Sequence, residues 1–230
     1  MTARKKSGAG QGKKRVLIVD DHPMMRQGLA QLIEAEPDLS VCGEAETAGK
    51  AVEAIAALKP DLVLVDISLP DRSGLELIKD FQSVQPGLPV LVISMHDESL
   101  YAERVLRAGG RGYIMKQEGG RKLMQAVRQV LGGQIYVSEK MSALILEVFS
   151  GRREETERSQ VGKLTDREFE VFQLIGQGKG TKEIATGLRL SPKTVEVHRI
   201  NIKHKLQLKT APELIRYAVR WVETGSASGR

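Results

Sequence analysis

Two adjacent aspartates end the first strongly apolar run of the chain. The run is VLIV at residues 16–19, and Asp20 and Asp21 follow it directly in the segment VLIVDDHP. Two carboxylates this close repel each other, and each resists losing its water. The pair therefore predicts that a compensating cation lies beside it.

Other polar side chains follow later apolar runs in the same way. Asp66 ends LVLVD, Ser94 ends PVLVIS, and Lys116 follows GYIM. If these runs are parallel strands of one open sheet, their carboxyl ends meet at one edge, where such sheets bind ligands. Three carboxylates, a hydroxyl and an ammonium group are then expected to converge. For any one acid alone, capping of a helix or turn is the simpler interpretation, but the full set argues against it.

The converging groups suit phosphoryl chemistry assisted by magnesium. Three carboxylates without a histidine or cysteine among them form a hard oxygen site, which favours Mg²⁺ over zinc, with water in the remaining positions. One carboxylate can act as nucleophile toward a phosphoryl group and form an aspartyl-phosphate. Mg²⁺ and Lys116 then neutralise charge on the phosphoryl oxygens, and Ser94 donates a hydrogen bond to one of them.

The elements that must position these groups alternate along the chain. Short β-branched runs predict strands, and stretches of helical period between and after them predict helices. The predicted strands are 15–20, 40–45, 62–66, 90–94 and 112–115, and the predicted helices are 24–36, 48–58, 74–84, 99–108 and 121–131. This order makes βαβ units, so we expect a parallel sheet covered by helices on both faces.

The C-terminal part of the chain has only helical signals. Thr165 to Glu168 and Thr210 to Glu213 form capping boxes, and Ser191 with Pro192 starts a helix. Four helices are expected, at about 166–177, 181–188, 192–206 and 210–223. About three residues join the second helix to the third, which is the proportion of a helix-turn-helix motif. The motif also occurs in purely structural roles.

The composition indicates a soluble globular protein of one large or two modest domains. The 230 residues are 41% hydrophobic and 28% charged. No apolar run approaches the roughly 20 residues of a membrane span, and the N-terminus lacks the apolar core of a signal peptide. Cys42 is the single cysteine, so an internal disulfide is excluded. A cytoplasmic protein without membrane contact is the simplest expectation.

Charge is distributed unevenly along the chain. Residues 16–161 carry 22 acidic and 16 basic side chains, whereas residues 162–229 carry 7 acidic and 12 basic ones. The basic part suits nucleic acid or an anionic surface, and a solvated basic face explains the charge equally well. We expect the acidic part to attract the basic part at rest, an attraction that would weaken with salt.

Residues 15 to about 133 resemble the receiver domain of two-component response regulators. The motifs VDDHP, VLVDISLPDRSG, VLVISMH and GYIMK stand where that family carries its acid pair, phosphoacceptor, switch hydroxyl and lysine. The resemblance implies that Asp66 accepts phosphate from a sensor histidine kinase. It also implies that Asp21, Asp66 and the Ser68 carbonyl bind Mg²⁺, while Asp20 acts through water.

The same resemblance implies a conformational switch. Phosphate draws Ser94 inward, and the ring of Tyr113 follows into the vacated space; an ordinary half-buried aromatic is the alternative for Tyr113. Pro70 and Gly74 shape the loop after the phosphoacceptor. The sequence departs from the family at Gln117, where many receivers carry a proline, often after a cis peptide, so a trans peptide is expected here.

Two histidines lie near the expected site. His96 stands two residues beyond Ser94, where the family tunes how fast phosphate is lost, and His22 follows the acid pair. The plainer interpretation of both is an exposed histidine on a loop.

Residues 164 to about 222 resemble the LuxR-type output domain of NarL/FixJ response regulators, on the segment LTDREFEVFQLIGQGKGTKEIATGLRLSPKTVEVHRINIKHKLQL. The resemblance implies a scaffold helix at 182–188 and a recognition helix at 192–206. It implies that residues 210–223 help to form a DNA-bound dimer, although their apolar stripe also suits the core: Leu214, Ile215, Ala218, Val219 and Val222. DNA contacts are expected from Lys182, Lys193, Thr194, Glu196, Val197, Arg199, Ile200, Asn201 and Lys203.

The expected organisation has five parts. A disordered basic tail (1–14) precedes a five-stranded, flavodoxin-like α/β receiver (15–133), and a linker (134–161) contains a short helix, Lys140–Phe149. A small all-α helix-turn-helix domain of four helices (162–225) and a short disordered tail (226–230) follow.

The expected function is transcriptional regulation controlled by phosphorylation. Phosphate on Asp66, taken from a kinase with Mg²⁺, changes homodimerisation and binding to promoter half-sites. We expect no enzymatic activity beyond the chain's own phosphoryl transfer and dephosphorylation. One alternative is a phosphatase that forms an aspartyl-phosphate, but no general acid for its leaving group is found. The other is a regulator whose receiver only contacts proteins and is never phosphorylated.

Overall fold

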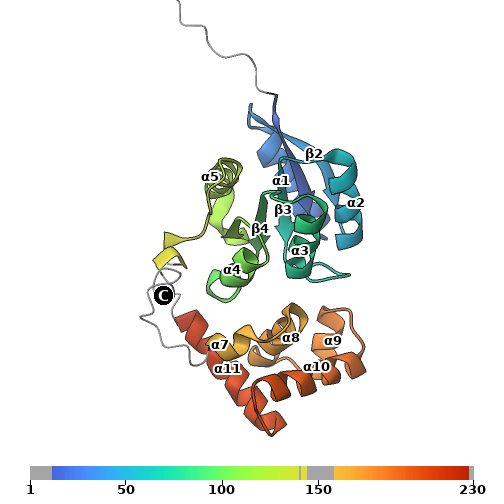
Figure 1. Cartoon of the computed structure of the whole chain (residues 1–230), viewed down its shortest axis with the longest axis vertical. Helices are drawn as coiled ribbons and strands as arrows, with labels where there is room; N and C mark the ends of the chain where they lie inside the picture. Colours follow the sequence, from blue (N-terminus) through green and yellow to red (C-terminus); the bar gives the residue numbers. More distant parts are fainter. Residues whose placement is uncertain (1–11, 140, 144–157, 228–230) are drawn as a thin grey trace, which may run out of the picture.

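The chain folds into an α/β domain that lies against a smaller helical domain (Figure 1). The computed structural model describes residues 12–139, 141–143 and 158–227. The strands are β1 (Lys14–Val19), β2 (Leu39–Ala45), β3 (Leu62–Asp66), β4 (Val90–Ser94) and β5 (Gly112–Met115). All pair in parallel in the order β2-β1-β3-β4-β5, which confirms the predicted five-stranded sheet.

The helices of the first domain cover both faces of the sheet. They are α1 (Pro23–Glu34), α2 (Ala48–Leu58), α3 (Gly74–Val84), α4 (Glu98–Arg107) and α5 (Gly119–Leu131). Successive side chains of β1 point to opposite faces of the sheet. Val16 and Ile18 pack with α1 and α5, while Leu17 and Val19 pack with α2, α3 and α4. Burial on both faces explains why the central strands are almost wholly apolar.

The segment that leaves the first domain extends the edge of the sheet. Tyr136 forms a parallel bridge with Gly112 of β5. The Tyr136 N–H donates to the Arg111 carbonyl (3.0 Å), and the Tyr113 N–H donates to the Tyr136 carbonyl (2.9 Å). The Ser138 N–H then donates to Glu98 Oε1 at 2.7 Å, at the start of α4. The predicted helix Lys140–Phe149 lies outside the described residues, apart from 141–143.

The second domain is entirely helical in its described part. Its helices are α7 (Arg158–Gly162), α8 (Asp166–Gly176), α9 (Thr181–Gly187), α10 (Pro192–Lys205) and α11 (Ala211–Ala227). Thr165 and Glu168 form the predicted capping box, and the Ser191 hydroxyl caps α10. The chain therefore starts α8 and α10 where these local signals indicated.

The apolar stripe of α11 serves mainly the core of its own domain. Leu214 and Ala218 are fully buried, whereas Ile215 is 42% exposed. Helix α8 approaches so closely that a Cβ added to Gly176 would lie 2.5 Å from the Ala218 carbonyl oxygen and from Val222 Cγ2. The core interpretation left open for this stripe thus accounts for most of it.

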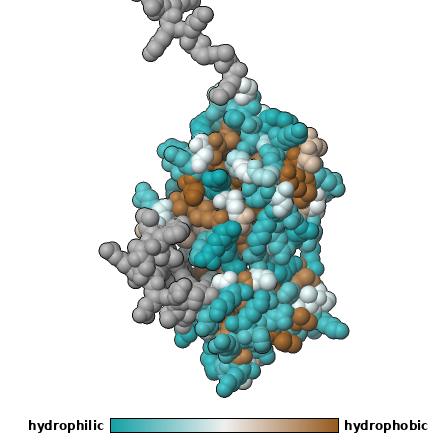
Figure 2. Space-filling view, viewed as in Figure 1, coloured by the Kyte–Doolittle hydropathy of each residue, from teal (hydrophilic) through white to brown (hydrophobic). Residues whose placement is uncertain are grey.

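The outer surface is largely hydrophilic on the face shown in Figure 2, with apolar side chains in small patches. None of the helices in the described ranges combines the length and apolar character that a bilayer crossing requires.

Candidate functional site

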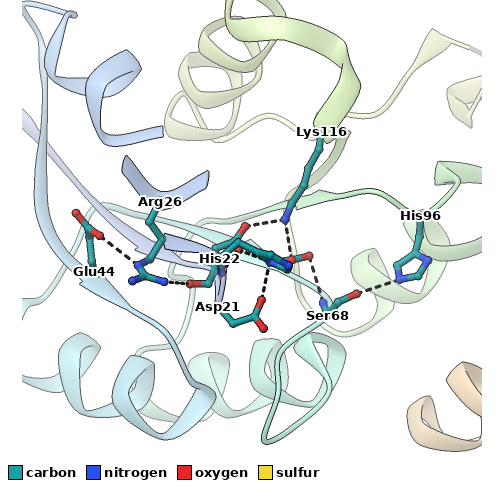
Figure 3. A network of polar contacts seen from close by, with 9 residues as sticks. Asp21, His22, Arg26, Glu44, Ser68, His96 and Lys116 are labelled. Carbon is teal, nitrogen blue, oxygen red and sulfur yellow. Dashed lines mark hydrogen bonds and ion pairs between the residues drawn. The ribbon is translucent and has the colours of Figure 1, made fainter. Parts of the chain in front are cut away.

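The side chains at the strand ends converge at the carboxyl edge of the sheet. Asp20 follows β1, Asp66 ends β3, and Lys116 follows β5. Lys116 reaches between the two carboxylates, its Nζ lying 2.7 Å from Asp20 Oδ2 and 2.7 Å from Asp66 Oδ2 (Figure 3). Asp20 is fully buried and Asp66 is 2% exposed. A lysine is therefore one cation that compensates the charge of the strand-end acids.

The buried setting shifts the proton affinities of this pair. Burial raises the pKa of the Asp66 carboxyl, although the charge and hydrogen bond of Lys116 oppose the shift. Burial acts to lower the pKa of Lys116, but Asp66 and the hydrogen bonds to both carboxylates outweigh it, so the pKa is raised. Lys116 thus remains an ammonium group, placed to neutralise charge that develops on Asp66.

The acids also fit a hard divalent cation such as Mg²⁺. One ligand atom each from Asp20, Asp21, His22 and Asp66 lies within 4.8 Å of the others. Asp21 Oδ1 is buried and receives no hydrogen bond from the described residues, although His22 Nδ1 is 2.8 Å away. A carboxylate oxygen held without a donor in this way is suited to a metal ligand.

Two neighbours of the acid pair were not predicted as site residues. His22 donates its N–H to Asp20 Oδ1 (2.8 Å), and its Nδ1 lies 3.1 Å from the same oxygen, although its side chain is 67% exposed. Arg26 donates from Nη1 to the Asp20 carbonyl (2.7 Å) and pairs with Glu44 (Figure 3). The sequence signal for both is their position at the start of α1, within six residues of the strand end.

Ser94 and its neighbours form the other wall of the site. Ser94 is fully buried, and its Oγ accepts the N–H of His96 (3.1 Å). Ser68 Oγ lies 3.0 Å from His96 Nε2, and the Ser68 N–H donates to Asp66 Oδ1 (3.2 Å). His96 therefore links the segment after β3 to the segment after β4, through its ring to Ser68 and through its backbone N–H to Ser94. His96 is only partly exposed, not a free loop histidine.

Tyr113 lies further inward than expected. It is 1% exposed, and its hydroxyl donates to the His96 carbonyl at 2.8 Å. Burial raises the pKa of Tyr113 well above its usual range, so the hydroxyl keeps its proton and this hydrogen bond. The ring already occupies an inward position. The Lys116–Gln117 peptide is trans, because no cis bond occurs in the described part of the chain.

The recognition-helix candidate α10 presents a mixed outer face. Lys193, Val197, Ile200 and Asn201 are exposed on this helix, and Lys203 is partly exposed. Lys182, on helix α9, is also exposed. Two of these exposed residues are large and apolar: Val197 is 48% exposed and Ile200 is 58% exposed. These side chains stand free to meet a partner.

The remaining predicted DNA contacts are engaged within the domain. The Thr181 hydroxyl donates to Glu196 Oε1 (2.7 Å), and Arg199 Nη1 donates to Thr181 Oγ1 (3.3 Å). Thr194 pairs with the capping Ser191 hydroxyl (2.7 Å). These contacts fasten α10 to α9 and to its own cap.

Comparison with known proteins assigns both domains. Residues 16–128 match the model for the response regulator receiver domain, and residues 162–218 match the model for bacterial regulatory proteins of the luxR family. The oxygen regulatory protein NreC of Staphylococcus haemolyticus is 34% identical over 210 residues, 90% of this chain and 97% of that protein. NreC of Staphylococcus aureus is 35% identical over the same shares.

The chain is a two-component response regulator of the LuxR-output family. It is a phosphorylation-controlled, DNA-binding transcription regulator, as predicted.

Solved structures of response regulators agree with this assignment. RcsB of Salmonella enterica serovar Typhimurium, bound to promoter rprA in the presence of phosphomimetic BeF₃⁻, is 26% identical with a TM-score of 0.61, covering 90% of this chain and 99% of that one. A LuxR-family response regulator from Aurantimonas is 32% identical with a TM-score of 0.56, over 60% of this chain and 99% of that one. The predicted fold class, a flavodoxin-like receiver followed by a helical domain, is confirmed.

In this response regulator the output domain docks against α3 and α4 of the receiver. Arg104 donates to the carbonyls of Val161 (2.6 Å) and Leu164 (3.1 Å). Asp166 lies 2.7 Å from Lys79 and 3.3 Å from Arg104. The signs of these charges are the reverse of the expected attraction, since the receiver supplies the cations and the output domain supplies the acid.

Aromatic rings cross the same boundary. Tyr101 of α4 meets Phe169 of α8 edge-on, with centroids 5.2 Å apart, and Phe169 meets Trp221 of α11 at 5.5 Å. The Arg104 guanidinium lies over the Phe169 ring, 3.9 Å from its centroid. The sequence analysis did not single out these rings or their packing across the two domains.

Proposed function

We propose that Asp66 is the phosphoacceptor of this response regulator and that a sensor histidine kinase is the donor. The observation that carries the proposal is the position of Lys116, whose ammonium group bridges Asp66 and Asp20 in a buried site. A cation held there suits charge that builds up on a phosphoryl group beside Asp66. Mg²⁺, held by Asp21, Asp66 and the Ser68 carbonyl with Asp20 acting through water, would add a second positive charge on the phosphoryl oxygens.

The transfer step requires only groups of this edge and the donor. A carboxylate oxygen of Asp66 forms a bond to phosphorus, and the bond from phosphorus to the donor's imidazole nitrogen breaks. That nitrogen keeps the electron pair. Lys116 neutralises the phosphoryl oxygens, and Ser94 donates to one of them. The chain needs no other substrate, so we infer no enzymatic activity beyond gain and loss of its own phosphoryl group.

The outer face of α10 is proposed as the DNA contact. Exposed Lys193 and Asn201 suit a phosphate and a base edge in the major groove, and Val197 and Ile200 suit thymine methyl groups. A homodimer of the phosphorylated regulator would place two such helices on two half-sites of double-stranded DNA. We propose a cytoplasmic location for this activity, because a transcription regulator must reach DNA.

Mass measurement with matched variants tests the phosphoacceptor. The full chain is incubated with Mg²⁺ and acetyl phosphate, and its intact mass and dimerisation are followed together. Asp66→Asn should abolish the gain of one phosphoryl mass and the dimer. Asp71→Asn is the matched control, because Asp71 accepts from the Ala48 (3.0 Å) and Gly49 (3.2 Å) N–H groups outside the site. Uptake that persists in Asp66→Asn would contradict the proposal, and no uptake by the unmodified chain would favour a receiver that acts by contacts alone.

Salt-dependent DNA binding tests the α10 face. Lys193→Ala should weaken binding to every sequence and reduce the slope of log affinity against log salt by about one. Lys122→Ala is the control, since Lys122 pairs with Glu118 on the receiver. An unchanged slope in Lys193→Ala would exclude that lysine from the DNA interface.

A further inference from the structure

The ring of His96 lies between the phosphorylation site and the output domain. On one side its Nε2 is 3.0 Å from Ser68 Oγ, two residues after Asp66. On the other side the ring stacks on Tyr101, with centroids 4.9 Å apart and planes inclined by 29°. Its own backbone is fixed by Ser94 and Tyr113, through the N–H and the carbonyl respectively. The position of this ring thus depends on what holds Tyr101.

The output domain supplies the support for Tyr101. Phe169 of α8 meets the Tyr101 ring edge-on at 5.2 Å, and both residues are at most 2% exposed. Behind Phe169 stand Trp221, at 5.5 Å, and the Arg104 guanidinium. A continuous line of packed rings therefore runs from the α8–α11 core to the edge of the phosphorylation site.

A cavity at the domain boundary lies beside the same line. The receiver contributes Asp21, Ser68 and His96 to its wall, and α8 contributes Arg167, Glu170 and Gln173. Gln173 is 2% exposed, and neither atom of its amide has a hydrogen-bond partner among the described residues. Helix α8 consequently covers the side of this cavity that lies opposite Asp21, Ser68 and His96.

We propose that the docked output domain sets the phosphoryl chemistry of Asp66, with Phe169 as a positioning residue that acts through Tyr101 and His96. The inference rests on the proposed role of Asp66. While Phe169 supports Tyr101, the His96 ring keeps its contact with Ser68, and α8 keeps covering the cavity beside Asp21. Both effects slow gain and loss of the phosphoryl group. In the loss step a water oxygen bonds to phosphorus, the bond from phosphorus to the Asp66 oxygen breaks, and Asp66 keeps the electron pair. Inorganic phosphate leaves, and the proton of water goes to phosphate or solvent.

The test uses full-length Phe169→Leu with acetyl phosphate and Mg²⁺. Both the rate of uptake and the rate of hydrolysis should rise between about 2-fold and 12-fold, the range that corresponds to loss of one aromatic pair. The matched control is Phe172→Leu, because Phe172 lies on the same helix and is fully buried, but contacts Tyr217 and Trp221 inside the output domain. It should change neither rate. Tyr101→Leu approaches the contact from the receiver side and should reproduce the acceleration if Phe169→Leu folds poorly.

A double variant separates positioning from a general loosening of the domains. In a His96→Ala background, Phe169→Leu should accelerate hydrolysis less than it does alone, because the ring it positions is gone and only the cover of the cavity is left to change. Unchanged rates in both Phe169→Leu and Tyr101→Leu, or equal acceleration by Phe172→Leu, would overturn the inference while leaving Asp66 as phosphoacceptor. Absence of uptake by the unmodified chain would overturn both.

Discussion

Replacement of Arg104 by methionine should separate the two domains without unfolding either. The guanidinium donates to two carbonyls of the output domain, lies 3.3 Å from Asp166 Oδ1 and covers the Phe169 ring. Its side chain is only 14% exposed, so these contacts are largely shielded from water. Methionine retains much of the apolar stem and removes the donors.

The size of the effect follows from the contacts that are lost. Two hydrogen bonds to carbonyls contribute about 1 kcal/mol each, and a cation over an aromatic ring contributes about 1 kcal/mol more. Asp166 keeps its contact with Lys79 at 2.7 Å, so no unpaired buried charge is added. The docked state should lose about 3 kcal/mol, which is roughly 150-fold in the docking equilibrium.

Hydrogen exchange measures this equilibrium directly. Amides of α4 and α8 that exchange only after undocking should exchange roughly 150-fold faster in Arg104→Met, and small-angle scattering should show a larger radius of gyration once the open form predominates. Arg107→Met is the control, because Arg107 is 68% exposed and pairs with Glu103 on its own helix. Unchanged exchange in Arg104→Met would refute the reasoning that the contacts of Arg104 stabilise the docked state.

Four further variants test the buried charges and the helices of both domains. Lys116→Met should lower the free energy of unfolding of the receiver by about 3 kcal/mol, because it leaves buried carboxylates unpaired. In denaturant titrations, added Mg²⁺ should restore part of this loss. Burial would raise the pKa of Glu168, but hydrogen bonds from Lys205 (2.6 Å) and Thr165 hold it below its usual range. That stabilisation is present above the ordinary glutamate pKa and is lost as pH falls through the lowered value. In Glu168→Gln the melting temperature should therefore fall less between neutral and acid pH than in the unmodified chain. Gly176→Ala should destabilise the output domain by about 3 kcal/mol in thermal unfolding, because the added Cβ would clash with α11. Gly28→Ala should stabilise α1 by about 0.5–1 kcal/mol, because a Cβ added there meets no described atom of another element within 4 Å.

The sequence predicted the receiver site because a parallel sheet converts order along the chain into proximity in space. Four of the five strands, β1, β3, β4 and β5, end at or just before a polar residue of the site, so the convergence of Asp20, Asp66 and Lys116 follows from strand order. The sequence did not show that Lys116 bridges both acids, since side-chain reach depends on the turn after β5.

The contacts between the domains lay beyond the same reasoning. Helical period identifies the buried face of α4 but not the surface that covers it. Arg104 and Phe169 come from different domains, and net charge pointed to the wrong sign of attraction. On α10, the sequence did not show that Glu196 and Arg199 both contact Thr181, whose hydroxyl the turn between α9 and α10 brings within reach. Their role as DNA contacts stays a prediction.

The attachment of Tyr136 to β5 determines where the chain can be divided. A receiver that ends at residue 133 would leave the Arg111 carbonyl and the Tyr113 N–H without their partner at the border of the sheet. Uncovered strand borders pair with one another between copies. Self-association of such a fragment would then result from the exposed edge of β5 and not from phosphorylation. A receiver that ends after Ser138 keeps Tyr136 paired with this edge.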